Sequence, residues 1–276
     1  MKVRIISAIC GIVLFLGILL LSTDIVLSSG YPIILTLAVA LLSGIGTYEI
    51  LHNTKIVKNN IIAGISCAAA FLLVLAFSLY GLTLGVMAYF FYLAVLLTVS
   101  LFVHDKTSYA ELAAAQAYVM FLSYSFYCVD NLISQKGLFS FLLVFIFAWG
   151  SDTFAYFTGV FLGKHKLCPS LSPKKTVEGA IGGIVGAAAL TAVACIICNA
   201  NGGQVNAVLL TVISPVFSVL GMVGDISASY IKRAAGIKDY GNLMPGHGGV
   251  LDRFDSVLLI APVFHAVLYL LPLINS

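Results

Sequence analysis

Charged residues are scarce in this sequence: only 9% of its 276 residues are Asp, Glu, Lys or Arg. A soluble globular protein carries about 25% charged residues, because its folded surface has to be hydrated. Apolar residues make up 61% of the chain, and the mean hydropathy is +1.09. This composition excludes a soluble enzyme, a disordered chain and a secreted disulfide scaffold. It indicates an all-α polytopic integral membrane protein.

Several chemical signatures are also missing. The six cysteines are scattered, and the pair Cys195 and Cys198 has no second pair or His nearby that would complete a metal site. No Walker A loop is present, because Gly159 to Lys164 has the wrong glycine spacing and lacks the following Ser or Thr. The apolar stretch after Lys2 and Arg4 is long for a secretory signal and no Ala-x-Ala site follows it, so a retained helix is expected.

About 20 apolar residues cross a bilayer core, and runs of this length recur along the whole chain. Polar residues, glycines and prolines separate them into about nine expected transmembrane helices. The boundaries are approximate, and the Gly81 break and the break at residues 201–204 are the weakest. The expected ranges are 5–22, 31–51, 60–80, 82–103, 109–128, 137–161, 177–199, 205–233 and 254–273.

The distribution of Lys and Arg orients these helices, since cationic residues accumulate on the cytoplasmic side. With the N-terminus inside and alternating loops, thirteen of the 14 Lys and Arg residues fall on the inside and only Lys136 falls outside. The sequence therefore predicts a cytoplasmic N-terminus and an external C-terminus. It also places the two longest loops, 163–176 and 234–253, in the cytoplasm.

Ionisable residues are sparse before residue 140 and cluster after it, which suggests two functional parts. Residues 1–136 are expected to form a lipid-facing scaffold, and residues 137–276 to carry a catalytic site. Within the first part, Glu49 and Glu111 lie near the cytoplasmic ends of their spans, and they are interpreted first as boundary residues and second as site residues. A charge inside a membrane span costs free energy unless it is paired or hydrated, so the later clusters predict a functional site.

Three polar blocks make up this second part. Asp152 lies inside an apolar helix, where one hydrogen bond to a neighbouring helix would also explain it. A basic loop with Lys174 and Lys175 leads to Thr176, a plausible N-cap, and such a loop suits either phosphate oxygens or lipid headgroups. Asp225 begins a polar helix stripe in the third block, and Asp252 and Asp255 open the last helix. Carboxylates on two helices flanked by cations are what a Mg²⁺–nucleotide site requires.

The third block resembles the signature of the phosphatidate cytidylyltransferase (CDP-diacylglycerol synthase) family. More than a dozen positions match at fixed spacing over 27 residues, and Met244 is the one mild departure from the family's usual Leu, Ile or Phe. The matching run is Ser229-x-Ile231-Lys232-Arg233-x4-Lys238-Asp239-x-Gly241-x2-Met244-Pro245-x-His247-Gly248-Gly249-Val250-x-Asp252-Arg253-Phe254-Asp255. The Asp152 block and the run from Ser172 to Gly179 resemble the family's middle region.

This resemblance implies cytidylyl transfer from CTP to phosphatidic acid, giving CDP-diacylglycerol and pyrophosphate with Mg²⁺ as cofactor. The implied location is the cytoplasmic face of the cell (inner) membrane, with the lipid bilayer as a partner and no nucleic acid involved. Asp225 and Asp252 are the implied metal ligands. The implied catalytic residues are Asp225, Lys232, Arg233, Asp252 and Arg253. The implied substrate-binding residues are Asp152, Ser172, Lys174, Lys175, Thr176, Ser229, Lys238, Asp239, Gly246, His247, Gly248, Gly249 and Asp255.

Alternatives stay open at several points. Asp152, Asp239 and Asp255 suit either an orienting role or a second cation, and His247 suits either acid–base chemistry or a structural role. Small-residue spacings such as Gly159/Gly163 and Gly179/Gly183 fit packing within the chain or a homodimer. A transporter for organic phosphates and a CTP-dependent polyprenol or lipid kinase are the competing functions, although no inverted repeat is visible.

Overall fold

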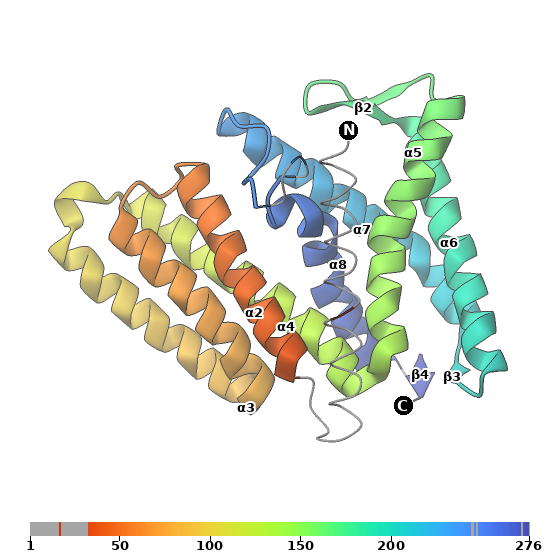
Figure 1. Ribbon diagram of the computed structural model, residues 1–276, viewed down its shortest axis with the longest axis horizontal. Coiled ribbons are helices and arrows are strands. Elements are labelled where there is room, and N and C mark those ends of the chain that lie inside the picture. Colours follow the sequence, from red (N-terminus) through yellow and green to blue (C-terminus); the bar gives the residue numbers. More distant parts are fainter. Residues whose placement is uncertain (1–16, 18–32, 244–245, 247, 272, 276) are drawn as a thin grey trace. The chain divides into compact units, whose positions relative to one another are not determined.

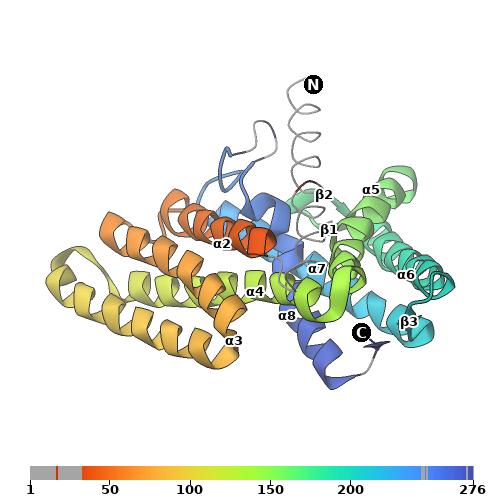
Figure 2. The same ribbon diagram turned by 60° about the horizontal axis from the view of Figure 1, so that its bottom comes forward.

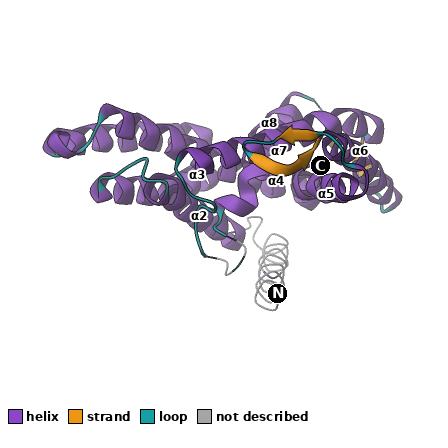
Figure 3. Ribbon diagram, turned by 90° about the horizontal axis from the view of Figure 1, so that it is seen from above, coloured by secondary structure: helices purple, strands orange, loops and turns teal. Residues whose placement is uncertain are grey.

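The computed structural model describes residues 17, 33–243, 246, 248–271 and 273–275. The expected helix 5–22 falls outside this range except for Gly17, and so does His247. Helices dominate the described residues, and strands form only two short pairs (Figure 3). Six of these helical segments are long and apolar enough to cross a membrane. The chain is thus an all-α polytopic membrane protein.

The described helices and helical turns follow in chain order. They are α2 (Ile33–Tyr48) with the π-helical turn η1 (Glu49–Asn53), α3 (Asn60–Phe102), the 3₁₀ turn η2 (His104–Lys106), α4 (Tyr109–Phe145), the π-helical turn η3 (Ile146–Gly150), α5 (Ser151–Leu162), α6 (Val177–Ala200), α7 (Ala207–Ala234) and α8 (Leu251–Leu270). The strands are β1 (Lys166–Cys168), β2 (Ser172–Thr176), β3 (Gln204–Val205) and β4 (Ile274–Asn275). Both strand pairs, β1–β2 and β3–β4, are antiparallel.

Helix α3 is a hairpin of two membrane-length halves. Its 43 residues would extend about 65 Å as one straight helix, roughly twice the bilayer core. Gly81 interrupts it with φ 82° and ψ 179°, a conformation that only glycine adopts easily. The two halves pack against each other (Figures 1 and 2), and Ser66 Oγ in the first half lies 3.0 Å from Tyr92 Oη in the second. The expected break at Gly81 is confirmed.

The break expected after the span 109–128 differs from the sequence prediction. Residues 130–136 were expected to separate two spans, but they continue α4, and the interruption falls at Gly137 with φ 78° and ψ 173°. The polar Asp130 does not end the helix because it is buried and both of its carboxylate oxygens accept hydrogen bonds from Thr36 Oγ1, at 3.0 and 3.1 Å. A hydrogen-bonded carboxylate leaves the helix intact, whereas the interruption needs the backbone freedom of glycine.

The described chain divides into two compact units. The first contains Met1–Ser134 and Ala234–Phe254, and the second contains Gln135–Arg233 and Asp255–Ser276. In the first unit, α2 packs on α3, with Ser43 Oγ donating to the Ala70 carbonyl, and Phe77 packs on two tyrosines of α4. In the second, Phe147, Phe217 and Phe264 form a buried aromatic cluster that joins η3, α7 and α8.

Glycines bring α5 and α6 together inside the second unit (Figures 1 and 2). A Cβ on Gly179 would lie 2.7 Å from the Ala155 carbonyl oxygen, and one on Gly183 would lie 2.9 Å from the Ser151 carbonyl oxygen. Gly182 and Gly186 would likewise meet Thr158 and Phe154. The small-residue spacings of these helices are therefore occupied within the chain, and they give no support to a homodimer.

Candidate active site

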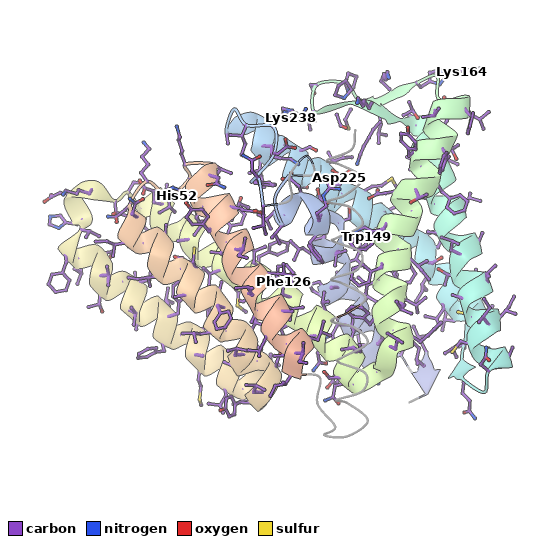
Figure 4. The ribbon with its side chains drawn as sticks, in the orientation of Figure 1. His52, Phe126, Trp149, Lys164, Asp225 and Lys238 are labelled. Atoms are coloured by element: carbon purple, nitrogen blue, oxygen red, sulfur yellow. The ribbon has the colours of Figure 1, made fainter. Side chains whose placement is uncertain are left out.

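An ion pair in the second unit joins the basic hairpin to α7. Lys175 Nζ contacts Asp225 Oδ2, and the two side chains are only 24% and 25% exposed. Figure 4 shows Asp225 in the upper part of α7. Since the Lys175 Nζ atom itself is buried, Asp225 supplies the negative charge that holds this ammonium group in place. The pair thus unites two of the three polar blocks.

The β1–β2 hairpin determines which lysine reaches Asp225. Within β2, Lys174 is exposed, whereas its neighbour Lys175 is half-buried and contacts Asp225. The hairpin is anchored at both ends. Thr176 Oγ1 caps α6 by accepting from Gly179 N at 3.1 Å, as expected for an N-cap, and Glu178 accepts from the backbone of Lys164 and His165 at 3.0 and 3.2 Å.

Two further carboxylates lie near this pair within the second unit. Asp152 on α5 is within electrostatic range of Asp225 and Lys175, and Asp255 on α8 is within range of Asp225, Asp152 and the buried Lys232. Gly224 brings two of these helices together, because a Cβ there would lie 2.6 Å from the Asp255 carbonyl oxygen. The result is a group of three carboxylates and two ammonium groups from α5, β2, α7 and α8, which suits a polyphosphate and its cation.

The signature segment before α8 is organised within the first unit. Asp252 Oδ2 accepts hydrogen bonds from Tyr240 N at 2.8 Å and Gly249 N at 2.9 Å, which closes residues 240–252 into a loop. Gly246 and Gly248 have φ values of 80° and 91°, so the loop needs glycine at both positions. Asp252 is therefore an internal support of this loop, in addition to its implied role as a ligand.

Glu49 is a part of this arrangement that the sequence analysis placed only second as a site residue. Its side chain is 3% exposed, and its two carboxylate oxygens accept from Val250 N and Leu251 N, each at 2.9 Å. One turn later, Asn53 Nδ2 donates to the Tyr240 carbonyl at 2.7 Å. Glu49 lies at the end of its span, as expected of a boundary residue, but its carboxylate is buried and bonded to the start of α8, which favours the second interpretation, a site residue. The applicable signal was the rule used for Asp152, that a carboxylate inside an apolar run needs a partner.

Comparison with known proteins decides the family. The sequence profile of the cytidylyltransferase family matches residues 2–271. The chain is 32% identical to the phosphatidate cytidylyltransferase of Staphylococcus saprophyticus, over 97% of this chain and 99% of that protein. It is 30% identical to the Staphylococcus aureus protein of that name over the same shares, and 39% identical to the Bacillus subtilis one over 61% of each chain.

The chain belongs to the cytidylyltransferase family. It is therefore an enzyme, a nucleotidyltransferase, and the resemblance drawn from the signature segment is confirmed. This membership decides against a transporter, because the matched profile covers nearly the whole chain. Its six candidate membrane spans make this cytidylyltransferase a multi-pass membrane protein.

The other implied site residues of this cytidylyltransferase are found in both units. In the second unit, Ser172 and Ser229 are half-buried and Arg233 is exposed. In the first unit, Lys238, Asp239 and Arg253 are exposed. Their substrate contacts stay predictions. The assignment of the scaffold to residues 1–136 and of the site to 137–276 also stays a prediction, although residues 234–254 cluster with the first unit.

The metal assignment has a chemical basis in this donor set. Among the described residues, no group of three or more His, Cys, Asp or Glu side chains could hold a metal ion. Mg²⁺ needs only one or two protein carboxylates, because phosphate oxygens and water complete its octahedron. Carboxylates beside lysines fit that requirement. The pairing of Asp225 with Asp252 joins residues of different units and stays a prediction.

Proposed function

We propose that this enzyme transfers the cytidylyl group of CTP to phosphatidate, giving CDP-diacylglycerol and pyrophosphate. The observation that carries the proposal is its full-length similarity to proteins named phosphatidate cytidylyltransferase. The group of acidic and basic residues around the Lys175–Asp225 pair supports it, since both substrates are phosphate anions that need cationic partners.

The reaction requires little proton chemistry from the protein. An oxygen of the phosphatidate phosphate forms a bond to the α-phosphorus of CTP, and the bond from that phosphorus to the bridging oxygen of pyrophosphate breaks. Because the attacking phosphate is already anionic, positioning and charge stabilisation dominate. Lys175 and Lys232 are suited to hold phosphate oxygens, and the carboxylates around them keep both ammonium groups oriented. When bound, Mg²⁺ would be held by Asp225 and Asp252, as the resemblance implies, and would offset phosphate charge; a second cation stays a prediction.

The distribution of cationic residues supports a location for this chemistry. With nine spans, a cytoplasmic N-terminus and an external C-terminus, the hairpin 163–176 and the segment 234–253 face the cytoplasm, where CTP is found. Phosphatidate reaches the same surface from the bilayer. We therefore assign the active site to the cytoplasmic face of the cell membrane.

The decisive experiment follows two labels of CTP. Purified enzyme in lipid nanodiscs receives phosphatidate, Mg²⁺ and CTP labelled at either the α- or the γ-phosphorus. We expect the α-label in the lipid and one pyrophosphate per lipid product. The γ-label in the lipid would instead identify a CTP-dependent lipid kinase, and no labelled lipid at all would also overturn the proposal.

Two carboxylate variants and a chelator test the site within the same assay. Asp225→Asn and Asp252→Asn should each lower kcat by about 10²-fold or more, because each removes a charge that positions cations at the phosphates. Asp105→Asn, in the exposed turn η2, is the matched control and should leave the rate within about twofold. Removing Mg²⁺ with EDTA should abolish turnover, and restoring Mg²⁺ should recover it. Unchanged rates in both site variants would contradict this assignment.

A further inference from the structure

The first unit contains a buried carboxylate that the proposed reaction does not use directly. Glu49 begins the π-helical turn η1, and its Oε1 and Oε2 each accept one backbone N–H at the start of α8. The first N–H groups of a helix have no partner within the helix, and a negative charge is favoured there by the helix dipole. Glu49 therefore caps the helix that carries Asp252 from a position 201 residues earlier in the chain.

The loop before α8 is also shaped around this carboxylate. A Cβ on Gly241 would lie 2.5 Å from Glu49 Oε1, and a Cβ on Gly249 would overlap the same carboxylate. Both glycines thus allow the backbone to approach Glu49 more closely than any other residue would. Helix α2 contacts the same region, since a Cβ on Gly46 would lie 3.0 Å from Leu251 Cδ2.

The backbone of Tyr240 in this loop is held by two side chains. Asn53 Nδ2 donates to the Tyr240 carbonyl at 2.7 Å, and Asp252 Oδ2 accepts from Tyr240 N at 2.8 Å. Glu49 and Asn53 thus fix the same loop that Asp252 closes. A displacement of this loop would change the position of the Asp252 carboxylate directly.

We infer that Glu49, assisted by Asn53, is a positioning residue for the cytidylyl transfer, holding the start of α8 and the loop 240–252 so that Asp252 is correctly placed. This inference rests on the proposed function for its catalytic part. Residues 1–136, which the sequence suggested as scaffold, then contribute Glu49 and Asn53 to holding the loop that Asp252 closes. A boundary residue at a helix end would be exposed, whereas Glu49 is 3% exposed with both oxygens bonded.

The test compares Glu49→Gln with Glu111→Gln. Glu111 is the matched control because it also accepts a backbone N–H, from Lys58 at 3.0 Å, but it lies at a half-exposed position away from the signature loop in sequence. Glutamine at position 49 offers one oxygen to two donors and turns an NH₂ group toward the other. Hydrogen–deuterium exchange of peptides covering 238–256 and steady-state kinetics are measured on both purified variants.

We expect Glu49→Gln to speed exchange in 238–256 and to lower kcat by about 10- to 100-fold, the usual effect of losing a group that orients a ligand. The Mg²⁺ concentration for half-maximal rate should rise, while the KM for phosphatidate changes less than twofold. Glu111→Gln should alter none of these values. Unchanged exchange in 238–256, or faster exchange with unchanged kcat and Mg²⁺ dependence, would overturn the inference.

A second pair of variants covers the case in which Glu49→Gln does not fold. Asn53→Ala removes only the hydrogen bond to Tyr240, and it should produce a smaller increase in exchange and a smaller loss of kcat. Glu49→Asp keeps the charge and should recover part of the rate. If wild-type enzyme makes no CDP-diacylglycerol, the proposed function fails, while the exchange comparison still decides whether Glu49 holds the loop.

Discussion

Lys175 and Asp225 show how one half-buried ion pair can serve an anionic substrate. Each side chain is about three-quarters covered, so neither charge is fully hydrated when its partner is removed. The preceding residue in the strand, Lys174, lies exposed. The pair thus selects one lysine of the basic hairpin for the interior and leaves the others at the surface.

Replacing Lys175 should therefore affect catalysis more than replacing an exposed lysine of the same hairpin. We expect Lys175→Met to lower kcat/KM for CTP by about 10²–10³-fold, because a cation aimed at phosphate oxygens is lost. Lys166→Met, on the exposed part of β1, is the control and should change it less than about threefold. Initial rates at varied CTP measure both effects. Equal losses in the two variants would indicate a general contribution of charge rather than a specific site.

Residues of the site differ in how far sequence alone could identify them. Asp225 and Lys175 were predictable because charges inside or beside apolar runs are costly and stand out. Glu49 carried the same signal, but its partners are the backbone N–H groups of Val250 and Leu251, which no side-chain pattern marks. Asp252 was identified by its motif, but its hydrogen bonds to Tyr240 N and Gly249 N depend on a loop conformation that only the structure shows.

At the scale of elements, glycine has two separate functions in this chain. Gly81 and Gly137 interrupt long helical runs through positive φ angles. The glycines of α5 and α6 instead have helical backbones and allow two helices to touch. The sequence located the break at Gly81 correctly. It placed the break before residue 138 at polar residues 130–136, because hydropathy does not report whether a buried Asp has a partner.

The reversal at Gly81 can be tested with a matched glycine of the same helix. A Cβ on Gly81 or on Gly64 would meet no atom within 4 Å, so the two positions differ in backbone conformation rather than in space. We expect Gly81→Ala to cost about 1–3 kcal/mol through backbone strain. Gly64→Ala should be neutral or slightly stabilising. The melting temperatures of the two variants are measured in detergent by size-exclusion chromatography after heating. Equal melting temperatures would contradict the strained turn.

The α5–α6 contact allows a complementary test inside the second unit. A Cβ on Gly182 would overlap the Thr158 side chain, so Gly182→Ala should destabilise this unit by about 1–3 kcal/mol through overpacking. The single tryptophan of the chain, Trp149, lies in η3, which contacts both helices, and its fluorescence reports the transition. Replacing Thr158 by Ala in the same protein should restore stability. A Gly182→Ala variant that unfolds at the wild-type temperature would refute the close contact.

At the scale of the whole molecule, the number and direction of the spans are set by where long helices break. Six segments qualify as spans among the described residues, and Gly81 and Gly137 each divide one that is long enough to cross twice. The expected helix 5–22 would complete nine. Composition predicted the membrane class because it sums over all residues, whereas the grouping of 234–254 with the first unit depends on contacts between distant segments.

Cysteine labelling tests the topology directly. In a background with all six native cysteines replaced, Lys106→Cys and Gln135→Cys introduce thiols at exposed positions near opposite ends of one predicted span. A membrane-impermeant maleimide added to intact cells should label position 135 and leave position 106 unlabelled until the membrane is opened. Labelling of both positions in intact cells would contradict the nine-span arrangement.

The long separation between Glu49 and its partners has a consequence for the order of assembly. During synthesis Glu49 is made about 200 residues before the two backbone N–H groups that donate hydrogen bonds to it. All of residues 135–233 must be inserted in the meantime, while this carboxylate has neither partner. A chain that stops before Leu251 therefore leaves a charged group without its partners and should be recognised by quality-control proteases.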